Sequence, residues 1–269
     1  MLTVLTPTYD RARTLPRLYD SLTRQEKTDF EWLVVDDGSR DGTRELIASL
    51  ASRAPFAVRY LSQSNGGKHV ALNLGVSRAM GDWIFVVDSD DWLPDNALQV
   101  VEAALQDVAG DGTVAGVCFR KTDARGYLLG QLRTDVPVPW EATPSQAGHR
   151  ARGELAYVCR RECMAAAPFP VFPGENFVPD QYLWNRVADQ GRMLFYLDRA
   201  VYCCEYLEDG YTRNFSTHLR RNPQGFFLFY AEQIWRDPRP VGKLKAVVRC
   251  AQCLLYRVVR RLRPGVAGG

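Results

Sequence analysis

Residues 81–93 decide the fold, and they read Gly-Asp-Trp-Ile-Phe-Val-Val-Asp-Ser-Asp-Asp-Trp-Leu. The four consecutive apolar residues at 84–87 are typical of a strand that is buried on both faces. Three carboxylates follow this strand directly: Asp88, Asp90 and Asp91. Alternation along an extended chain would put Asp88 and Asp90 on one side and Asp91 on the other.

The three carboxylates predict a site for a cation or a sugar hydroxyl. Anions this close repel one another, so the arrangement is most stable when an opposite charge lies among them. Oxygen ligands at the mouth of a strand suit Mg²⁺ or Mn²⁺, which often bind through one or two carboxylates plus substrate phosphates. On these residues alone, a solvated acidic turn that caps a helix starting at Pro94 explains the pattern equally well.

The composition of the 269-residue chain is that of an ordinary globular protein, with 46% hydrophobic and 24% charged residues. This length allows one large domain or two small ones. The net charge of +3 is unevenly distributed. Residues 1–100 hold 11 Lys/Arg and 14 Asp/Glu, whereas residues 201–269 hold 12 Lys/Arg and 5 Asp/Glu. The basic end indicates an anionic partner, either a membrane surface or phosphate. We expect no nucleic-acid partner.

The seven cysteines show no spacing typical of a disulfide framework. Cys250-x-x-Cys253 is the only CxxC, and no second pair lies at zinc-ribbon spacing, so the pattern favours a reducing, cytoplasmic setting. Met1 leads directly into a strand-like stretch, so we expect no signal peptide. No apolar run approaches the ~20 residues that a transmembrane helix needs.

The first 106 residues alternate four times between a strand pattern and a helix pattern. The expected strands are 2–6, 30–35, 58–61 and 84–87. This alternation predicts a parallel, doubly wound sheet, in which ligands lie beyond the carboxyl ends of the strands. The turns at 7–10, 36–39, 65–68 and 88–91 all follow strands, so we expect them to meet at one edge. That convergence favours a ligand site over a solvated acidic turn.

Two common nucleotide-binding motifs are missing. There is no G-x-G-x-x-G after the first strand and no G-x-x-x-x-G-K-[ST] anywhere in the chain. A dinucleotide-dependent oxidoreductase and a P-loop NTPase are therefore excluded as leading interpretations.

The second half is less regular. Strands are expected at 114–119, 155–159 and 192–204, and helices at 181–188 and 223–235, whereas 121–152 is proline-containing and predicted to be a loop or lid. Asp180 falls at the start of the 181–188 helix, where an isolated aspartate would ordinarily be a capping residue.

Residues 243–263 form a separate pattern at the C-terminal end. One apolar stripe at helical spacing shares this segment with seven Lys/Arg and no acidic residue. The pattern is typical of a helix that lies in an anionic membrane interface. A terminal helix packed on its own domain would give the same stripe.

Together the four loops resemble those of the family 2 glycosyltransferases, which have the GT-A fold. The matching stretches are 6–9 (Thr-Pro-Thr-Tyr), 34–43 (Val-Val-Asp-Asp-Gly-Ser-Arg-Asp-Gly-Thr), 65–68 (Asn-Gly-Gly-Lys) with Asn73, and 81–91, where Asp88-Ser89-Asp90 looks like the DXD motif. The resemblance is close over residues 2–106 and continues more weakly through 174–188 and 205–214, as in enzymes of bacterial surface-polysaccharide synthesis. It implies an inverting, metal-dependent transferase that moves a sugar from a nucleotide-diphosphate donor, expected to be a UDP-sugar, to a hydroxyl of a glycan or lipid-linked acceptor.

The same resemblance assigns site residues. The nucleotide-binding positions would be Pro7, Thr8, Tyr9, Asp37, Lys68, Asp88 and Ser89. The ligands of Mn²⁺ or Mg²⁺ would be Asp88, Asp90 and Asp91. Many family members carry Glu-Asp before the acceptor-side helix, with the Asp as general base, and here that pair reads Pro179-Asp180. Asp180 is the predicted base, Glu175 the alternative, and Arg213 an additional candidate cation.

The resemblance also implies a division of the chain. Residues 1–236 would form the GT-A domain, with a nucleotide-binding half at 1–106 and an acceptor-binding half at 107–236, followed by a basic amphipathic helix and tail at 237–269. We expect a cytoplasmic protein that contacts the inner face of the cell membrane peripherally through 243–263.

Two other functions are compatible with the residues. A nucleotidyltransferase could use a similar sheet, although such enzymes usually have a glycine-rich basic loop after the first strand, and here that loop is Pro-Thr-Tyr-Asp. A nucleotide-sugar-binding or membrane-binding module that has lost catalysis is compatible with the altered Pro179-Asp180 pair.

Overall fold

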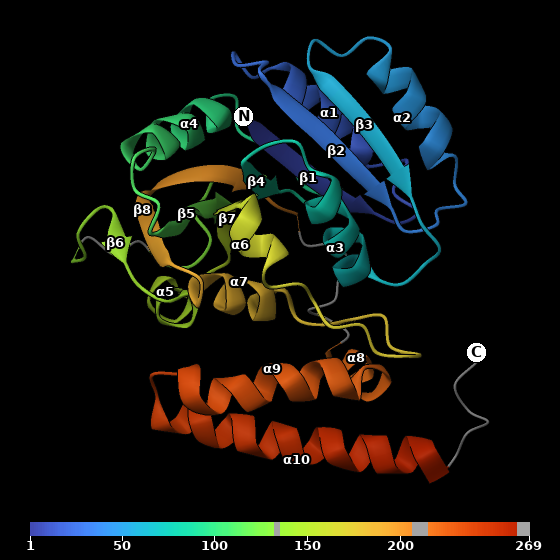
Figure 1. The fold of residues 1–269 in the computed structure, drawn as a ribbon, viewed down its shortest axis with the longest axis vertical. Coiled ribbons are helices and arrows are strands. Elements are labelled where there is room, and N and C mark those ends of the chain that lie inside the picture. The colour runs from blue at the N-terminus through green and yellow to red at the C-terminus, as the bar shows by residue number, and fades with distance from the viewer. Residues whose placement is uncertain (132–134, 206–214, 263–269) are drawn as a thin grey trace.

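An eight-stranded sheet forms the centre of the molecule (Figure 1). The computed structural model describes residues 1–131, 135–205 and 215–262. In spatial order the strands are β3, β2, β1, β4, β7, β5, β8 and β6. Their bounds are β1 Leu2–Thr8, β2 Phe30–Asp36, β3 Ala57–Ser62, β4 Trp83–Val86, β5 Val114–Thr122, β6 Trp140–Glu141, β7 Leu155–Arg160 and β8 Arg192–Cys203.

Ten helices accompany the sheet in the described part of the chain. They are α1 Leu15–Thr23, α2 Thr43–Ala51, α3 Lys68–Arg78, α4 Ala97–Asp107, α5 Pro144–Ala151, α6 Arg161–Ala165, α7 Asp180–Ala188, α8 Phe215–Arg221, α9 Pro223–Arg236 and α10 Pro240–Leu262.

The first four strands pair in parallel, as the sequence predicts. β1 pairs with β2 and β4, and β2 pairs with β3, all in parallel register. The strand order reverses at β1, because β2 lies on one side of it and β4 on the other. In a doubly wound sheet this point opens a crevice at the carboxyl ends of the strands. β7 then runs antiparallel between β4 and β5, so the whole sheet is mixed.

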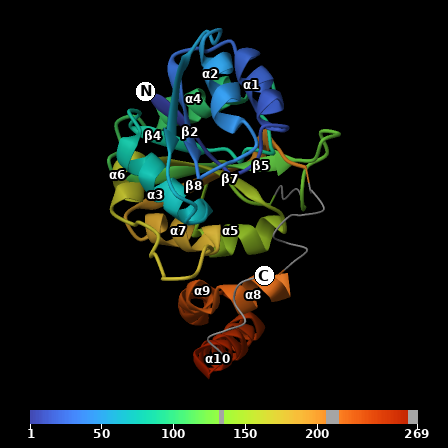
Figure 2. The ribbon, with the colours of Figure 1, turned by 90° about the vertical axis from the view of Figure 1, so that its right-hand side faces the viewer.

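Helices cover both faces of the sheet (Figures 1 and 2). α1, α2 and α4 bury apolar residues such as Leu18, Ile47 and Val101 against one face. α3, α6, α5 and α7 cover the other face with residues such as Leu72 and Val187. α9 lies beyond α7, and α10 lies beyond α9, so the helical extension is confirmed as a further layer on that side.

The prediction of a loop over 121–152 is wrong in its second half. α5 begins there with a complete capping box, in which Thr143 Oγ1 accepts from Gln146 N and Gln146 Oε1 accepts from Thr143 N. Pro144 occupies the first turn, where its missing N–H is harmless. The Thr-Pro-x-Gln pattern indicates a helix start, whereas the surrounding prolines favour a loop.

One expected helix start is displaced by a few residues. α4 begins at Ala97 and not at Pro94. α2 follows its N-cap Gly42, and the neighbouring Asp41 carboxylate accepts hydrogen bonds from Thr43 N and Oγ1. Helix boundaries shift in this way because several polar residues near a start compete for the same free amides.

A buried carboxylate, Glu31 on β2, connects β1 and β3 on either side of it through hydrogen bonds. Its side chain is 1% exposed and accepts from Thr3 Oγ1 at 2.6 Å, Arg59 Nη1 at 2.8 Å and Met80 N at 2.5 Å. Burial opposes ionisation, but these hydrogen bonds and the Arg59 charge lower the pKa of Glu31 below its usual 4.5. A carboxylate with several donors is strongly stabilised in its charged form.

Replacing this carboxylate tests its contribution. Glu31→Gln should lower the free energy of unfolding at pH 7 by about 1.5–3 kcal/mol, the usual worth of a charge-assisted hydrogen bond. Because the folded-state pKa is depressed, the stabilisation is present above pH 4.5 and is lost as the pH falls through the lower folded value. Urea unfolding at pH 7 and in acid should therefore show the gap to wild type narrowing in acid. The exposed Glu45→Gln is the control, and an equal gap at both pH values would contradict this account.

Candidate active site

One cleft gathers residues from all four predicted loops. It has a volume of about 440 Å³ and lies at the carboxyl ends of β1–β4. Its lining residues are Pro7, Thr8, Tyr9, Arg11, Asp37, Asn65, Gly67, Lys68, Ala71, Asp88, Ser89, Asp90 and Asn176. Every residue that the sequence assigned to nucleotide binding is among them, whereas Asp91 and Asp180 are not.

Asp37 fixes the β2 and β3 loops against each other. Its carboxylate accepts from Gln63 Nε2 at 2.7 Å, Gly66 N at 2.8 Å and Gly67 N at 2.7 Å. Gly67 has a φ of +96°, and a Cβ there would lie 1.9 Å from the carbonyl oxygen of Asn176. Only glycine fits this approach. The β3 loop and the segment around Asn176 therefore meet at the cleft.

The three aspartates after β4 have different surroundings. Asp91 is 6% exposed and lies against β8, where its carboxylate accepts from Tyr202 Oη at 2.7 Å and Glu205 N at 3.2 Å. Asp88 Oδ1 pairs with Lys68 at 2.7 Å. Within the described residues, no other residue donates a hydrogen bond to the Asp90 carboxylate. α1 supports this loop through Arg17, which donates to the Asp90 carbonyl oxygen.

Crowding of like charges shifts the pKa values of this cluster. Burial and the charge of Asp88 raise the pKa of Asp90, and the same two causes raise the pKa of Asp91 to about 7. Burial also opposes ionisation of Asp88, but the positive charges of Lys68 and Lys121 lower the pKa of Asp88 below its usual value. The cluster therefore has more negative charge than its surroundings compensate.

The cleft residues fit a divalent cation bound together with a diphosphate. Asp88 and Asp90 both line the cleft, and Asp90 has a carboxylate without a donor from another described residue. Over the described ranges, no group of three or more His, Cys, Asp or Glu side chains is arranged as a ligand set. Two carboxylates suffice where substrate phosphates complete the coordination, as is usual for Mg²⁺. Asp91, with both oxygens occupied, is a weaker ligand than the sequence predicts, and its role stays a prediction.

Lys68 connects this acidic cluster to α7. Its ammonium lies 2.7 Å from Asp88 Oδ1 and 2.6 Å from Asp180 Oδ2. Burial opposes its charge, but the two carboxylates raise the pKa of Lys68 well above its usual value. Asp180 is the first residue of α7, one position after the N-cap Pro179, so it is not the capping residue itself. Its carboxylate points to the cleft lysine instead.

Glu175, the alternative base, has a structural role. It is 7% exposed, and its carboxylate accepts from Gln224 N and Gly225 N at the start of α9. Arg260 of α10 lies 3.7 Å from it. A carboxylate that caps a helix and pairs with an arginine is not free to take a proton from a substrate. Arg213, the additional candidate cation, lies outside the described residues.

Sequence reasoning did not identify Arg11 and Asn176 as cleft residues. Arg11 directly follows the predicted Pro-Thr-Tyr-Asp loop, and this position could have indicated a cation at the cleft. Asn176 comes from the second half of the chain, and only the close approach at Gly67 places it in the cleft. No local pattern indicates such a contact.

A second cavity of about 520 Å³ lies between α5, α7 and the end of α9. Among the described residues, none of the predicted site residues lines it. Its lining residues include Ser145 of α5, Gln181 of α7, Gln233 of α9 and Asp237, which follows α9. Since ligands of doubly wound sheets bind at the strand ends, the cleft at the ends of β1–β4 is the candidate active site.

Comparison with known families identifies the class. Residues 3–166 match the family described as glycosyl transferase family 2, and the chain belongs to this family. Similar curated proteins include the uncharacterized glycosyltransferase alr2836 of Nostoc sp., 35% identical over 40% of this chain and 34% of that protein. EpsJ of Bacillus subtilis, also an uncharacterized glycosyltransferase, is 24% identical over 86% of this chain and 70% of its own length.

A third relative has a stated substrate. The poly(ribitol-phosphate) beta-N-acetylglucosaminyltransferase TarS of Staphylococcus aureus is 31% identical over 50% of this chain and 23% of TarS. This chain thus spans about a third of alr2836 and about a quarter of TarS.

Solved structures share the fold. TarS 1–349 in complex with UDP-GlcNAc superposes with a TM-score of 0.68 at 20% identity, covering 97% of this chain and 74% of that one. The mannosyltransferase PcManGT from Pyrobaculum calidifontis, in complex with GDP-Man and Mn²⁺, superposes with a TM-score of 0.60 at 20% identity. The match covers 97% of this chain and 75% of that chain. The predicted GT-A fold is therefore confirmed.

Tyr202 on β8 provides a test of how the acidic loop is held. Its hydroxyl donates to Asp91 and accepts from Asp88 N at 3.0 Å, in a fully buried position. Tyr202→Phe should lower the free energy of unfolding by about 1–3 kcal/mol, because the buried Asp91 carboxylate and the half-buried Asp88 N–H lose a partner. Urea unfolding measures the change.

The matched control is Tyr196→Phe on the same strand. Tyr196 is also buried and stacks on Phe119 at 5.5 Å, but its hydroxyl makes no hydrogen bond to a described residue. We expect this variant to stay within about 0.5 kcal/mol of wild type. Equal losses in the two variants would contradict the bridging role of Tyr202.

Proposed function

We propose that the protein is an inverting glycosyltransferase that moves a sugar from a nucleotide-diphosphate donor, a UDP-sugar, to an acceptor hydroxyl. The observation that carries this proposal is the convergence of four separate loops on one cleft. Membership of glycosyl transferase family 2 supports it. The complex of the similar TarS structure with UDP-GlcNAc supports the choice of a UDP-sugar.

The nucleotide would lie along the β1 and β2 loops. Pro7, Thr8 and Tyr9 offer an apolar and aromatic surface for the base, and Tyr9 is 46% exposed, which leaves its ring accessible. Asp37 would contact the base or ribose while holding the β3 loop. Ser89 and Asp88 lie at the other side of the cleft, where the ribose and diphosphate would follow.

The diphosphate would bind near the acidic loop with a divalent cation. Asp88 and Asp90 would hold Mn²⁺ or Mg²⁺, and Asp91 would support the loop from behind. When bound, the metal supplies positive charge that stabilises the leaving diphosphate. Lys68 and Arg11, which also line the cleft, would add positive charge on the protein side.

Asp180 is the proposed general base. Inversion in a single displacement needs a carboxylate on the face of the sugar opposite the leaving group, where it accepts the proton of the attacking hydroxyl. Asp180 is 37% exposed at its side chain, so an acceptor can reach it. The ammonium of Lys68 lies 2.6 Å from Asp180 Oδ2 and would occupy this oxygen before the donor binds. A bound diphosphate would compete for Lys68 and so leave Asp180 accessible to the acceptor hydroxyl.

The acceptor would be a hydroxyl of a glycan or a lipid-linked glycan. The named activity of TarS on poly(ribitol-phosphate) supports a surface-polymer acceptor. We place the enzyme in the cytoplasm, in peripheral contact with the inner face of the cell membrane through 243–263. Among the described residues, no helix combines the length and apolar character needed to span a bilayer.

The two rival functions differ in product. A nucleotidyltransferase would release pyrophosphate, and a binding module that has lost catalysis would bind UDP without donor hydrolysis or transfer. The proposed transferase releases UDP. Product analysis of one reaction with a nucleotide sugar therefore separates the three.

Removing the proposed base should impair chemistry more than binding. Asp180→Asn is expected to lower turnover by about 10²–10⁴-fold, the usual size of a general-base effect, with UDP affinity nearly unchanged. UDP release during transfer and calorimetric titration with UDP measure the two quantities. Asp107→Asn, at the exposed end of α4, is the control. Near wild-type turnover in the Asp180 variant would remove Asp180 from the mechanism.

Metal dependence can be tested without an acceptor. In a panel of nucleotide sugars tested with Mn²⁺, the UDP-sugars should raise the melting temperature of the protein more than the other nucleotide sugars do. A ligand that binds only the native state stabilises that state. Asp90→Asn should abolish the part of the shift that requires Mn²⁺ and leave the metal-free shift in place. An unchanged response to Mn²⁺ in this variant would rule out Asp90 as a metal ligand.

A further inference from the structure

α10 exposes a continuous apolar face. We call it the outward face, and its residues are Val241, Leu244, Val247, Val248, Leu254, Leu255, Val258 and Val259, each between 43% and 78% exposed. They recur three and four residues apart, which places them along one side of the helix. An apolar surface of this extent is unusual for a protein surface in water and marks an interaction site.

The opposite side of α10 is already packed. Ala246, Cys250 and Cys253 are between 0% and 9% exposed and lie toward α8 and α9, where Cys253 joins Phe226 and Leu219 in a small core. α10 therefore packs on its own domain through this side, whereas the apolar residues of the outward face stay exposed. Figure 2 shows α10 as the outermost element on this side of the molecule.

Positive charge borders the outward face. Lys243 and Lys245 are exposed at the start of α10 and form no ion pair with a described residue. The sequence of α10 contains no acidic residue. Pairing two copies of the chain through this face would bring the same positive charges together, which is unfavourable. An anionic lipid surface complements both the apolar stripe and the lysines.

We propose that the outward face of α10 docks on an anionic membrane surface, lying in the lipid headgroup region parallel to the membrane. This inference rests on the proposed transferase function only where it concerns the acceptor. The exposed Trp235, 81% accessible in the last turn of α9, lies close in sequence to the start of α10. Tryptophan is favoured at lipid–water interfaces because its ring is amphipathic.

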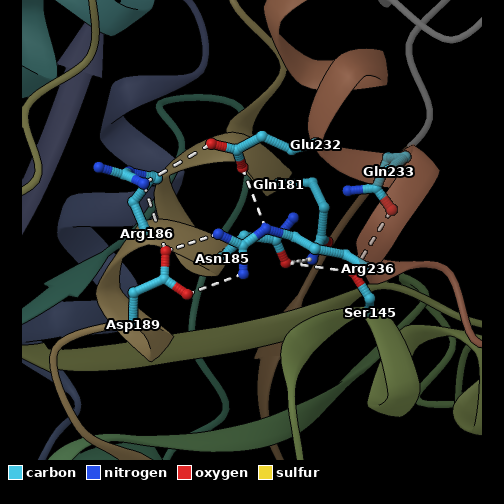
Figure 3. A network of polar contacts seen from close by, with 8 residues as sticks. All are labelled: Ser145, Gln181, Asn185, Arg186, Asp189, Glu232, Gln233 and Arg236. Carbon is cyan, nitrogen blue, oxygen red and sulfur yellow. Dashed lines mark hydrogen bonds and ion pairs between the residues drawn. The ribbon is translucent and has the colours of Figure 1, made fainter.

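The docked helix is fixed relative to the candidate active site. Figure 3 shows the contacts between α7 and α9, in which Arg236 pairs with Asp189 at 2.5 Å and Arg186 lies 3.8 Å from Glu232. Ser145 of α5 bonds to Gln233 in the same network. α7 begins with Asp180. The helix that carries the proposed base is therefore joined to the helix on which α10 packs.

A second connection runs from α10 to the segment before Asp180. Arg260 Nη2 donates to the Gly174 carbonyl oxygen at 2.6 Å and lies near Glu175, which caps α9. Asn176, the next residue, lines the cleft. Two helices, α9 and α10, thus lie between α7 and the membrane-facing side. This arrangement suits a lipid-linked glycan better than a bare lipid headgroup.

Vesicle flotation tests the docking directly and needs neither donor nor acceptor. The full chain should float with phosphatidylcholine vesicles that contain phosphatidylglycerol, and only weakly with pure phosphatidylcholine. Leu244→Gln with Leu255→Gln, and separately Lys243→Gln with Lys245→Gln, should each lower the partition coefficient about tenfold or more, since each pair removes an apolar or an electrostatic contribution. High salt should weaken binding of wild type and of the leucine variant.

Matched controls and a second readout separate the alternatives. Met80→Gln and Arg78→Gln change an exposed apolar and an exposed basic residue away from α10, and should float like wild type. UDP-induced thermal shifts should be equal in all variants, so a failed docking proposal is distinguishable from a failed transferase proposal. Flotation that is unchanged in both α10 variants would overturn the inference. So would a wild-type dimer in light scattering that dissociates in the leucine variant, since a second copy would then cover the face.

Discussion

The ammonium of Lys68 between Asp88 and Asp180 is the interaction on which the site depends. It joins the acidic loop after β4 to the first turn of α7, so it connects the part of the chain that the sequence assigns to the nucleotide with the part assigned to the acceptor. Two carboxylates facing one half-buried cation hold it charged. Without that cation the carboxylates would face each other across the cleft with only repulsion between them. The geometry of the cleft is thus set by charge as much as by packing.

The nucleotide-binding half was predictable because its signals are local. Each strand of 1–106 ends in a loop of polar or glycine residues, and parallel strands bring such loops to one edge whatever the details of packing. The sequence alone therefore predicts Asp37, Lys68 and Asp88 at the same edge of the sheet. Asp91 shows the limit of this reasoning, because its direction depends on a hydrogen bond to Tyr202, which lies far along the chain on β8.

The second half was harder because its structure depends on contacts between distant segments. α5 went unrecognised among prolines although its capping residues were in place. Asn176 enters the cleft only through the approach of its carbonyl to Gly67, and Glu175 becomes a helix cap only once α9 packs against it. A sequence pattern specifies which residues can carry chemistry. It does not specify which of them the tertiary structure uses for support, and Glu175 belongs to the second group.

The account is tested most directly by a crystal structure of the protein soaked with UDP and Mn²⁺. We predict an anomalous manganese peak beside Asp88 and Asp90, with the base against the loop of Pro7, Thr8 and Tyr9. Both diphosphate groups should lie between that peak and Lys68. Manganese or nucleotide density bound elsewhere on the molecule, such as in the cavity between α5 and α7, would contradict the account.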